Sequence, residues 1–194
     1  GLPERVALLR SVLDRLADAD YVRIGLDHFA RPGDPLAEAA RTGHLGRNFQ
    51  GYVVQRTRAL IGCGVSAISD SGGAYWQQAL DLDDWSAAVA AGQLPVARGV
   101  RVDDDDQLRR FVIMRLMCEG RLDFTDVAER YGVRVPDVLA NELAVLEAEH
   151  RDLATVDRAA GTVTATPLGH HLIRNVARVF DRYARGAASG SPSI

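Results

Sequence analysis

The sequence has 194 residues, which is enough for one large domain or two small ones, and its hydrophobic fraction of 47% allows a buried core. The formal net charge of -3 and an isoelectric point near 6.0 exclude a protein that binds nucleic acid through a strongly basic overall surface. No apolar run approaches the roughly 20 residues of a membrane span, and the first residues do not resemble a signal peptide. We therefore expect a cytoplasmic protein without a membrane partner.

The two cysteines, Cys63 and Cys118, lie far apart in the sequence. A disulfide framework is therefore not expected, and two thiols alone cannot enclose a metal ion. Glu147 and His150 have a spacing that suits two metal ligands on one helix face, but no further ligand follows nearby. We predict that the chain has no metal site of its own.

The first hundred residues alternate between helix and strand patterns. Apolar residues three to four apart predict a helix over residues 6–16, and alternation predicts a strand over 21–26. A second helix begins at Asp34-Pro35 and stops at Gly43, and a Gly-rich turn leads into a buried strand within 60–69. This order predicts part of an α/β layer with parallel strands, and two strands are too few for a stable sheet.

Helices dominate the prediction from residue 76 onward. Residues 76–92 are expected to be helical, and the four aspartates at 103–106 precede an apolar helix that runs through Cys118. Acidic residues at a helix start complement the helix dipole, and a cation site is the minor alternative.

The C-terminal part is expected to contain further helices and one hairpin. The predicted elements are a helix over 124–131 closed by Gly132, a helix from Pro136-Asp137, a hairpin of 153–156 with 162–165, and a last helix from Thr166-Pro167 with Leu168, Leu172, Val176 and Val179 facing inward. This order is typical of a winged-helix module. We therefore expect a helical domain over 101–185 after a first domain over 1–100, and a flexible tail over 186–194.

Residues 25–32, Gly-Leu-Asp-His-Phe-Ala-Arg-Pro, resemble a late barrel strand of the oxygen-independent coproporphyrinogen III oxidases, a radical S-adenosylmethionine (SAM) family. Further matching motifs follow in order over about residues 2–183, and several motifs in order are more specific than any one of them. They are Arg-Asn-Phe-Gln-Gly-Tyr at 47–52, Gly-Cys-Gly-Val-Ser-Ala-Ile-Ser at 62–69, Arg-Arg at 109–110, Leu-Met-Cys at 116–118, Arg-Leu-Asp at 121–123, Leu-Ile-Arg-Asn at 172–175 and Phe-Asp at 180–181.

The resemblance implies an α/β fold: the C-terminal part of an incomplete (β/α) radical-SAM barrel followed by a mostly helical, winged-helix-like domain. It also implies the family's chemistry, in which a 4Fe–4S cluster held by three cysteines reduces SAM to a radical. That radical takes hydrogen from a propionate of coproporphyrinogen III. Loss of carbon dioxide and an electron leaves a vinyl group, and two rounds give protoporphyrinogen IX in anaerobic haem biosynthesis.

The sequence departs from the family pattern in its cysteines. The closely spaced cysteine triad, the glycine-rich SAM-binding segment and the acidic residues of the earlier strands are absent. Three thiolates are needed when SAM takes the fourth iron, and Cys63 and Cys118 cannot replace them. We therefore expect this chain to be inactive by itself, with no catalytic residue of its own, and to require the N-terminal half of the barrel as its partner.

The resemblance also suggests which residues lie near the site. The main chain near Ala30 and the position of Met117 are expected to contact SAM, and the alternative for Met117 is a methionine of the core. Because strand ends form the site of such a barrel, the expected substrate-pocket positions are Asp27, His28, Phe29, Arg31, Asn48, Gln50 and Tyr52.

Each of these pocket residues has a purely structural alternative. His28 could donate a hydrogen bond to a substrate carboxylate or could instead orient Asp27 or a loop carbonyl. The polar side chains of 48–52 could line the pocket or bond their own loop. Arg31 and Arg47 could bind propionates bidentately or form ion pairs at the surface.

Two alternative functions remain at this point. One is another haem-related member of the radical SAM family. The other is a winged-helix module that binds nucleic acid, but its recognition helix near 137–150 would carry Glu142, Glu147 and Glu149, which repel phosphate. We therefore expect no nucleic acid partner.

Overall fold

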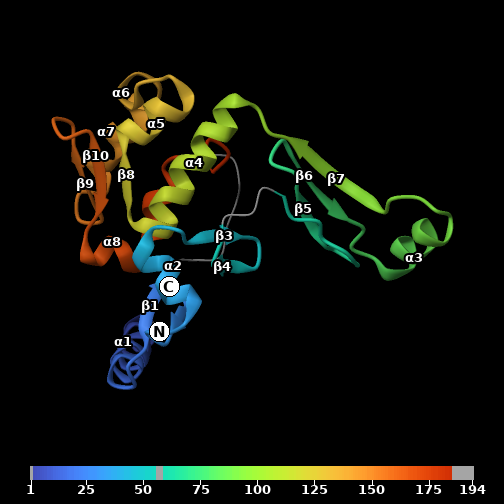
Figure 1. Ribbon diagram of the computed structural model, residues 1–194, viewed down its shortest axis with the longest axis horizontal. Helices are drawn as coiled ribbons and strands as arrows, with labels where there is room; N and C mark the ends of the chain where they lie inside the picture. The colour runs from blue at the N-terminus through green and yellow to red at the C-terminus, as the bar shows by residue number, and fades with distance from the viewer. Residues whose placement is uncertain (1, 56–58, 185–194) are drawn as a thin grey trace. The chain divides into compact units, whose positions relative to one another are not determined.

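The computed structural model describes residues 2–55 and 59–184 (Figure 1). The chain forms two compact units, a larger unit of Gly1–Arg56 with Leu108–Ile194 and a smaller unit of Thr57–Gln107. This division differs from the expected boundary at residue 100, because the segment before residue 57 packs with elements beyond residue 107. The assignment of 1–100 to a barrel stays a prediction, and the expected tail at 186–194 lies outside the described residues.

The N-terminal part of the larger unit contains two helices and two hairpins. Its elements are α1 (Leu2–Asp18), β1 (Val22–Gly25), β2 (His28–Ala30), α2 (Pro35–Thr42), β3 (Gly46–Asn48) and β4 (Gly51–Val53). The α2 boundaries confirm the expected signals, since Asp34 accepts a hydrogen bond from the Leu36 amide and Gly43 ends the helix at a φ of 73°.

The expected parallel strands are absent from the described residues, where every strand pair is antiparallel. For the strand expected over 21–26, the cause is the connection between β1 and β2. Leu26 and Asp27 link the two strands directly, and Leu26 adopts a φ of 45°. A parallel pair needs a crossover of about a dozen residues or more. A link of two residues therefore permits only a hairpin.

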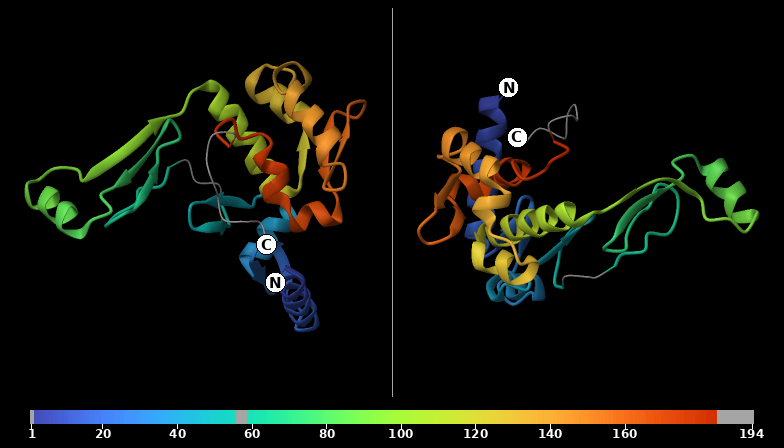
Figure 2. Two further views of the ribbon diagram at one scale, coloured as in Figure 1. Left: turned by 180° about the vertical axis from the view of Figure 1, so that it is seen from behind. Right: turned by 90° about the horizontal axis from the view of Figure 1, so that it is seen from above.

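The smaller unit is a narrow antiparallel sheet with the strand order β5-β6-β7. It contains β5 (Ile68–Asp70), β6 (Ala74–Gln78), α3 (Leu82–Ala90) and β7 (Val96–Arg101), and α3 lies at one end of the ribbon (Figure 2). Residues 76–78 were expected to be helical and are instead strand, because β6 is paired on both sides. The helix begins only after Asp81, whose carboxylate accepts from the amides of Asp83 and Asp84.

Helices and a three-stranded sheet form the described chain from Asp104 onward, which belongs to the larger unit from Leu108. The elements are α4 (Asp104–Glu119), β8 (Arg121–Asp123), α5 (Phe124–Tyr131), α6 (Val135–Val138), α7 (Ala140–Glu149), β9 (Ala154–Asp157), β10 (Thr162–Ala165), α8 (Pro167–His171) and α9 (Ile173–Arg178). The sheet order is β8-β10-β9. The helix ending at Gly132 and the β9–β10 hairpin confirm the expectations from the sequence.

The last predicted helix is divided into α8 and α9 at Leu172, whose φ and ψ are -111° and 32°. Because the helix is interrupted, its apolar residues do not form one stripe. Val176 is fully buried, whereas Leu168 is 49% exposed, so the inward orientation expected for Leu168 is wrong.

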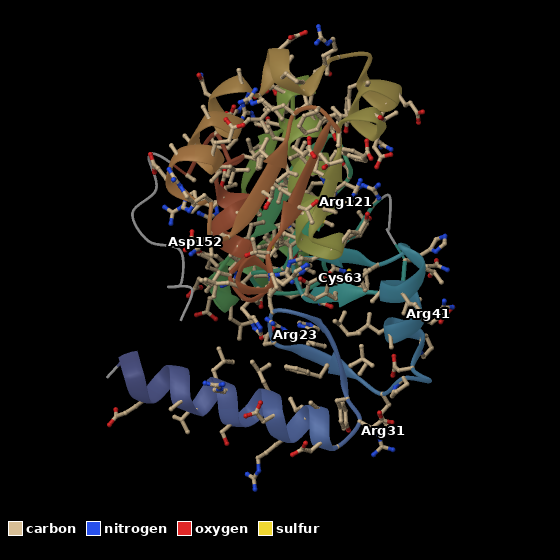
Figure 3. All side chains as sticks on the ribbon, turned by 90° about the vertical axis from the view of Figure 1, so that its left-hand side faces the viewer. Arg23, Arg31, Arg41, Cys63, Arg121 and Asp152 are labelled. Atoms are coloured by element: carbon tan, nitrogen blue, oxygen red, sulfur yellow. The ribbon has the colours of Figure 1, made fainter. Side chains whose placement is uncertain are left out.

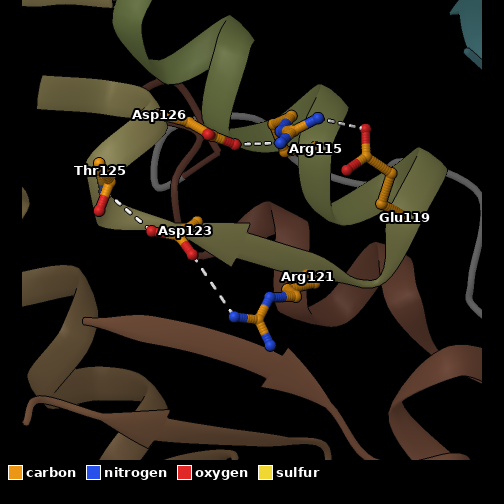
Figure 4. A network of polar contacts seen from close by, with 6 residues as sticks. All are labelled: Arg115, Glu119, Arg121, Asp123, Thr125 and Asp126. Carbon is orange, nitrogen blue, oxygen red and sulfur yellow. Dashed lines mark hydrogen bonds and ion pairs between the residues drawn. The ribbon is translucent and has the colours of Figure 1, made fainter. Parts of the chain in front are cut away.

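A network of charged side chains joins α4 to α5 (Figure 4). Arg115 binds Glu119 at 2.6 Å and also binds Asp126. Asp123 accepts a hydrogen bond from the Thr125 amide at 3.0 Å and so caps α5. The acidic run at the start of α4 has the same capping role, because Asp103 and Asp106 exchange amide-to-carboxylate bonds of 2.8 and 3.1 Å.

Two hydrophobic cores lie in the described part of the larger unit. The N-terminal core consists of Ile24, Ala30, Ala37, Ala39, Leu45, Tyr52 and Cys118. The C-terminal core is built on fully buried side chains of Val112, Leu116, Leu122, Val127, Val135, Leu139, Leu143, Leu146, Val163, Val176 and Phe180. The last turn of α4 belongs to both, because Met117 packs in the C-terminal core and Cys118 in the N-terminal core. No helix in the described part of the chain is both long and apolar enough to span a membrane.

The substitution Gly169→Ala tests how closely α8 packs against the C-terminal sheet. A Cβ added there would lie 1.7 Å from the carbonyl oxygen of Leu153, a backbone atom that cannot swing away. We expect Gly169→Ala to lower the free energy of unfolding by about 1–3 kcal/mol, measured by urea unfolding. The control is Gly33→Ala, where nothing lies within 4 Å of the added Cβ. Equal stability of Gly169→Ala and the parent chain would contradict this packing.

Candidate functional site

The two N-terminal hairpins meet the end of α4 at Tyr52. This residue is 6% exposed, and its hydroxyl donates a hydrogen bond of 2.9 Å to the Met117 carbonyl oxygen. Tyr52 and Met117, which lie 65 positions apart, were expected near the site for separate reasons. The structure brings them into direct contact.

The Met117 carbonyl needs this donor because α4 stops abruptly. Gly120 has a φ of 64° and donates its amide to the Leu116 carbonyl at 2.8 Å, and the chain then enters β8. The last carbonyls of a helix have no partner within it, so the tyrosine hydroxyl satisfies an oxygen that the turn leaves open. Burial raises the pKa of Tyr52 to about 12, so the hydroxyl keeps its proton at neutral pH.

His28 and Asp27 form a second element of the site. The Nδ1 atom of His28 lies 2.9 Å from Asp27 Oδ1. The pKa of Asp27 is lowered by a hydrogen bond from its own backbone amide, by the His28 contact and by the positive charge of Arg47. This contact agrees with the structural alternative for His28, in which the histidine ring orients the Asp27 carboxylate.

The other side of the His28 ring faces the β3–β4 hairpin. The ring is edge-on to Tyr52, with a centroid separation of 5.2 Å and an interplanar angle of 76°. Its Nε2 faces Gly51, where an added Cβ would lie only 2.4 Å from that nitrogen and where φ is 139°. A glycine at position 51 is therefore required both by the backbone and by the approach of His28.

Arg47 completes the group around Tyr52. The two residues are cross-strand partners of β3 and β4, and the Arg47 Cζ lies over the tyrosine ring at 5.0 Å from its centroid. The Nη1 atom of Arg47 is buried and has no hydrogen-bond partner among the described residues. Arg47 therefore forms a cation–π pair with Tyr52 and keeps one buried N–H group without a hydrogen bond among the described residues.

The remaining expected pocket residues are less closely grouped. Ala30 is buried in the N-terminal core, and Phe29 is half-buried beside Arg23 in the β1–β2 register. Arg31 is exposed at the end of the hairpin (Figure 3) and lies over Tyr21 at 5.7 Å.

The loop between β3 and β4 bonds to itself. Asn48 Oδ1 accepts a hydrogen bond from the Gln50 amide at 2.8 Å, and Gln50 is exposed. For Asn48 the structure therefore shows the local bonding that was the alternative to a pocket role.

Arg23 and His171 are contacts that the sequence did not identify. The Arg23 guanidinium bonds His171 Nδ1 and, at 3.3 Å, the Leu26 carbonyl. Burial, followed by the positive charge of Arg23, lowers the pKa of His171. The only sequence signal was a charged residue within an apolar strand, and it could not indicate a partner 148 positions away.

The residues present do not fit an iron–sulfur cluster. The sequence has two cysteines, Cys63 in the smaller unit and Cys118 in the larger one, and no group of three potential metal ligands occurs in the part of the chain that the structure describes. For SAM, Ala30 offers a small residue at the end of β2, whereas the Met117 side chain lies in the core and its carbonyl accepts from Tyr52. The contact of Met117 with SAM stays a prediction.

Tyr52→Phe tests the link between the hairpins and α4. Removal of the hydroxyl leaves the Met117 carbonyl without its donor in a buried position, which costs about 1–3 kcal/mol. We expect the free energy of unfolding to fall by that amount in chemical denaturation. Tyr21→Phe, at a partly exposed tyrosine of the same unit, is the matched control. A loss of the same size in both variants would show that the Met117 bond is not the cause.

Comparisons with known proteins show what the chain is similar to. Residues 102–169 match the family model of the HemN C-terminal domain. The chain is 38% identical to an oxygen-independent coproporphyrinogen III oxidase of Pseudomonas aeruginosa over 93% of its own length and 39% of the relative. It is 39% identical to the Escherichia coli protein of the same name over 95% of its length and 40% of the relative.

A solved structure gives the same result. Coproporphyrinogen III oxidase (HemN) from Escherichia coli, described as a radical SAM enzyme, matches with a TM-score of 0.87 and 38% identity over 92% of this chain and 41% of that one. The mixed α/β class is thereby confirmed. The chain spans less than half of these relatives. In sequence and in structure, it corresponds to the C-terminal portion of the oxygen-independent coproporphyrinogen III oxidases, as the resemblance predicted.

Proposed function

We propose that this chain supplies the C-terminal part of an enzyme that converts two propionates of coproporphyrinogen III to vinyl groups by radical oxidative decarboxylation. The observation that carries the proposal is the convergence of three motifs. Residues 25–32, 47–52 and 116–118 carry the sequence resemblance, and His28, Tyr52 and Met117 from these motifs meet at the end of α4. Motifs so far apart would not need to meet if each had only a local role.

The chain's own residues would bind and orient ligands. SAM, when bound, supplies the radical chemistry, and the main chain near Ala30 is the proposed contact. His28 bonds Asp27 through Nδ1, and its Nε2, which lies against Gly51, is the nitrogen left to bond a substrate carboxylate. The cluster must be held by cysteines from an N-terminal part, so the chain by itself is inactive in this proposal.

We propose that the C-terminal part of the larger unit is a winged-helix-like domain, and the order of its elements supports this proposal. The helix α4, the strand β8, the helices α5, α6 and α7 and the β9–β10 hairpin follow one another in that order, and the sheet order β8-β10-β9 places the first strand beside the last. We do not propose nucleic acid as a partner. Glu142 on α7 pairs with Arg109 at 2.8 Å, and Glu147 pairs with Arg158 at 2.7 Å, so two of the three acids of this helix have internal roles.

A chimeric enzyme tests the proposal. Residues 1–194 would replace the matching C-terminal portion of the Escherichia coli enzyme, and the chimera would be assayed for SAM cleavage and for protoporphyrinogen IX. We expect both activities, and we expect His28→Gln to raise KM for coproporphyrinogen at least about tenfold, the effect of losing a hydrogen bond to a charged group. His44→Gln, at an exposed histidine bonded to Thr42, is the control.

The two assays separate the outcomes. A chimera that cleaves SAM but forms no vinyl product would contradict the oxidase assignment and favour another radical SAM reaction. An effect of His28→Gln no larger than that of His44→Gln would remove His28 from the substrate site.

A further inference from the structure

Three buried nitrogen atoms of arginine side chains have no hydrogen-bond partner within the described residues: Arg23 Nε, Arg47 Nη1 and Arg115 Nε. Two of these guanidinium groups are otherwise engaged. Arg23 bonds His171 and the Leu26 carbonyl, and Arg115 pairs with Glu119 and Asp126. Arg47 differs, because its contact is the aromatic face of Tyr52. A buried guanidinium donor without an acceptor is costly, so Arg47 marks a position where an acceptor from outside the described chain would be favourable.

The surroundings hold Arg47 in one place. Its strand β3 pairs with β4 in a register that sets Arg47 opposite Tyr52, and Tyr52 is fixed at its far end by the bond to Met117. A guanidinium over an aromatic ring keeps its N–H groups free for hydrogen bonds in its own plane. Little side-chain freedom would be lost when an anion binds, which favours affinity.

Charge identifies the class of anion. Asp27 lies close enough for the positive charge of Arg47 to lower the pKa of its carboxyl group, so the neighbourhood already contains one negative charge at neutral pH. A second single charge can be accommodated by Arg47, whereas a doubly charged phosphate would be repelled more strongly by Asp27. The fork of a guanidinium matches the two oxygens of a carboxylate.

We propose that Arg47, and not Arg31, is a binding residue for one carboxylate group, in a site that it forms with His28 around Tyr52. Both residues contact the same tyrosine, Arg47 over its ring and His28 at 5.2 Å between ring centroids. Arg31 is exposed and lies over Tyr21 instead. If the proposed function is right, on which this identification of the ligand rests, the carboxylate is a propionate of coproporphyrinogen III.

Side-chain NMR of the 194-residue chain tests the carboxylate site directly. Sodium propionate is titrated while the arginine Nε–Hε signals are followed, with inorganic phosphate as the second probe. We expect propionate to shift the Arg47 signal saturably and Arg47→Gln to weaken propionate binding about tenfold. Arg31→Gln is the matched control and should leave binding unchanged. Arg47→Lys, which keeps the charge but loses the fork, should weaken binding and covers the case in which Arg47→Gln disturbs folding.

The outcomes separate this inference from the proposed function. Unchanged propionate binding in folded Arg47→Gln or Arg47→Lys, or a stronger response of Arg47 to phosphate, would overturn the carboxylate site. Coproporphyrin III and its tetramethyl ester form the second pair of probes. If the Arg47 variants lose propionate binding, the carboxylate site is upheld, whether or not the chain prefers coproporphyrin III to its ester. Equal binding of coproporphyrin III and its ester would count against the proposed substrate and not against the carboxylate site. A productive chimera whose Arg47 does not respond to propionate would uphold the function and overturn this inference.

Discussion

The hydrogen bond from the Tyr52 hydroxyl to the Met117 carbonyl is the contact on which the arrangement of the larger unit depends. It exists because α4 ends at a glycine with positive φ and leaves a buried carbonyl open. The two cores adjoin at this turn, with Met117 in one and Cys118 in the other, and Leu26 packs against both. Tyr52 thereby ties the N-terminal hairpins to the C-terminal helices, beside the contact of Arg23 with His171.

The same tyrosine organises the candidate site. Its hydroxyl is used for structure, while its ring supports Arg47 on one strand and His28 on the other hairpin. Gly51 makes room for the histidine. Because the polar end of Tyr52 is occupied and its pKa is raised to about 12 by burial, we regard it as a positioning residue, and the groups left to meet a ligand are those of Arg47 and His28.

The sequence predicted features with local causes and missed those with distant ones. The helix end at Gly132 follows from nearby residues and was correct. Residues 76–78 were expected to be helical but form a strand, because partners on both sides stabilise that strand. Family motifs indicated the neighbourhood of His28, but no sequence pattern could indicate that Tyr52 bonds Met117 or that one Arg47 donor is unused, since both facts depend on packing between distant segments.

Native-state hydrogen exchange at increasing denaturant would test the link between the cores most directly. If the account is right, slowly exchanging amides of 22–53 lose protection together with those of the last turn of α4 and the β8–β10 pair, because the Tyr52 contact makes them one cooperative unit. Loss of protection across 22–53 at much lower denaturant, with α4 and β8–β10 still protected, would contradict it.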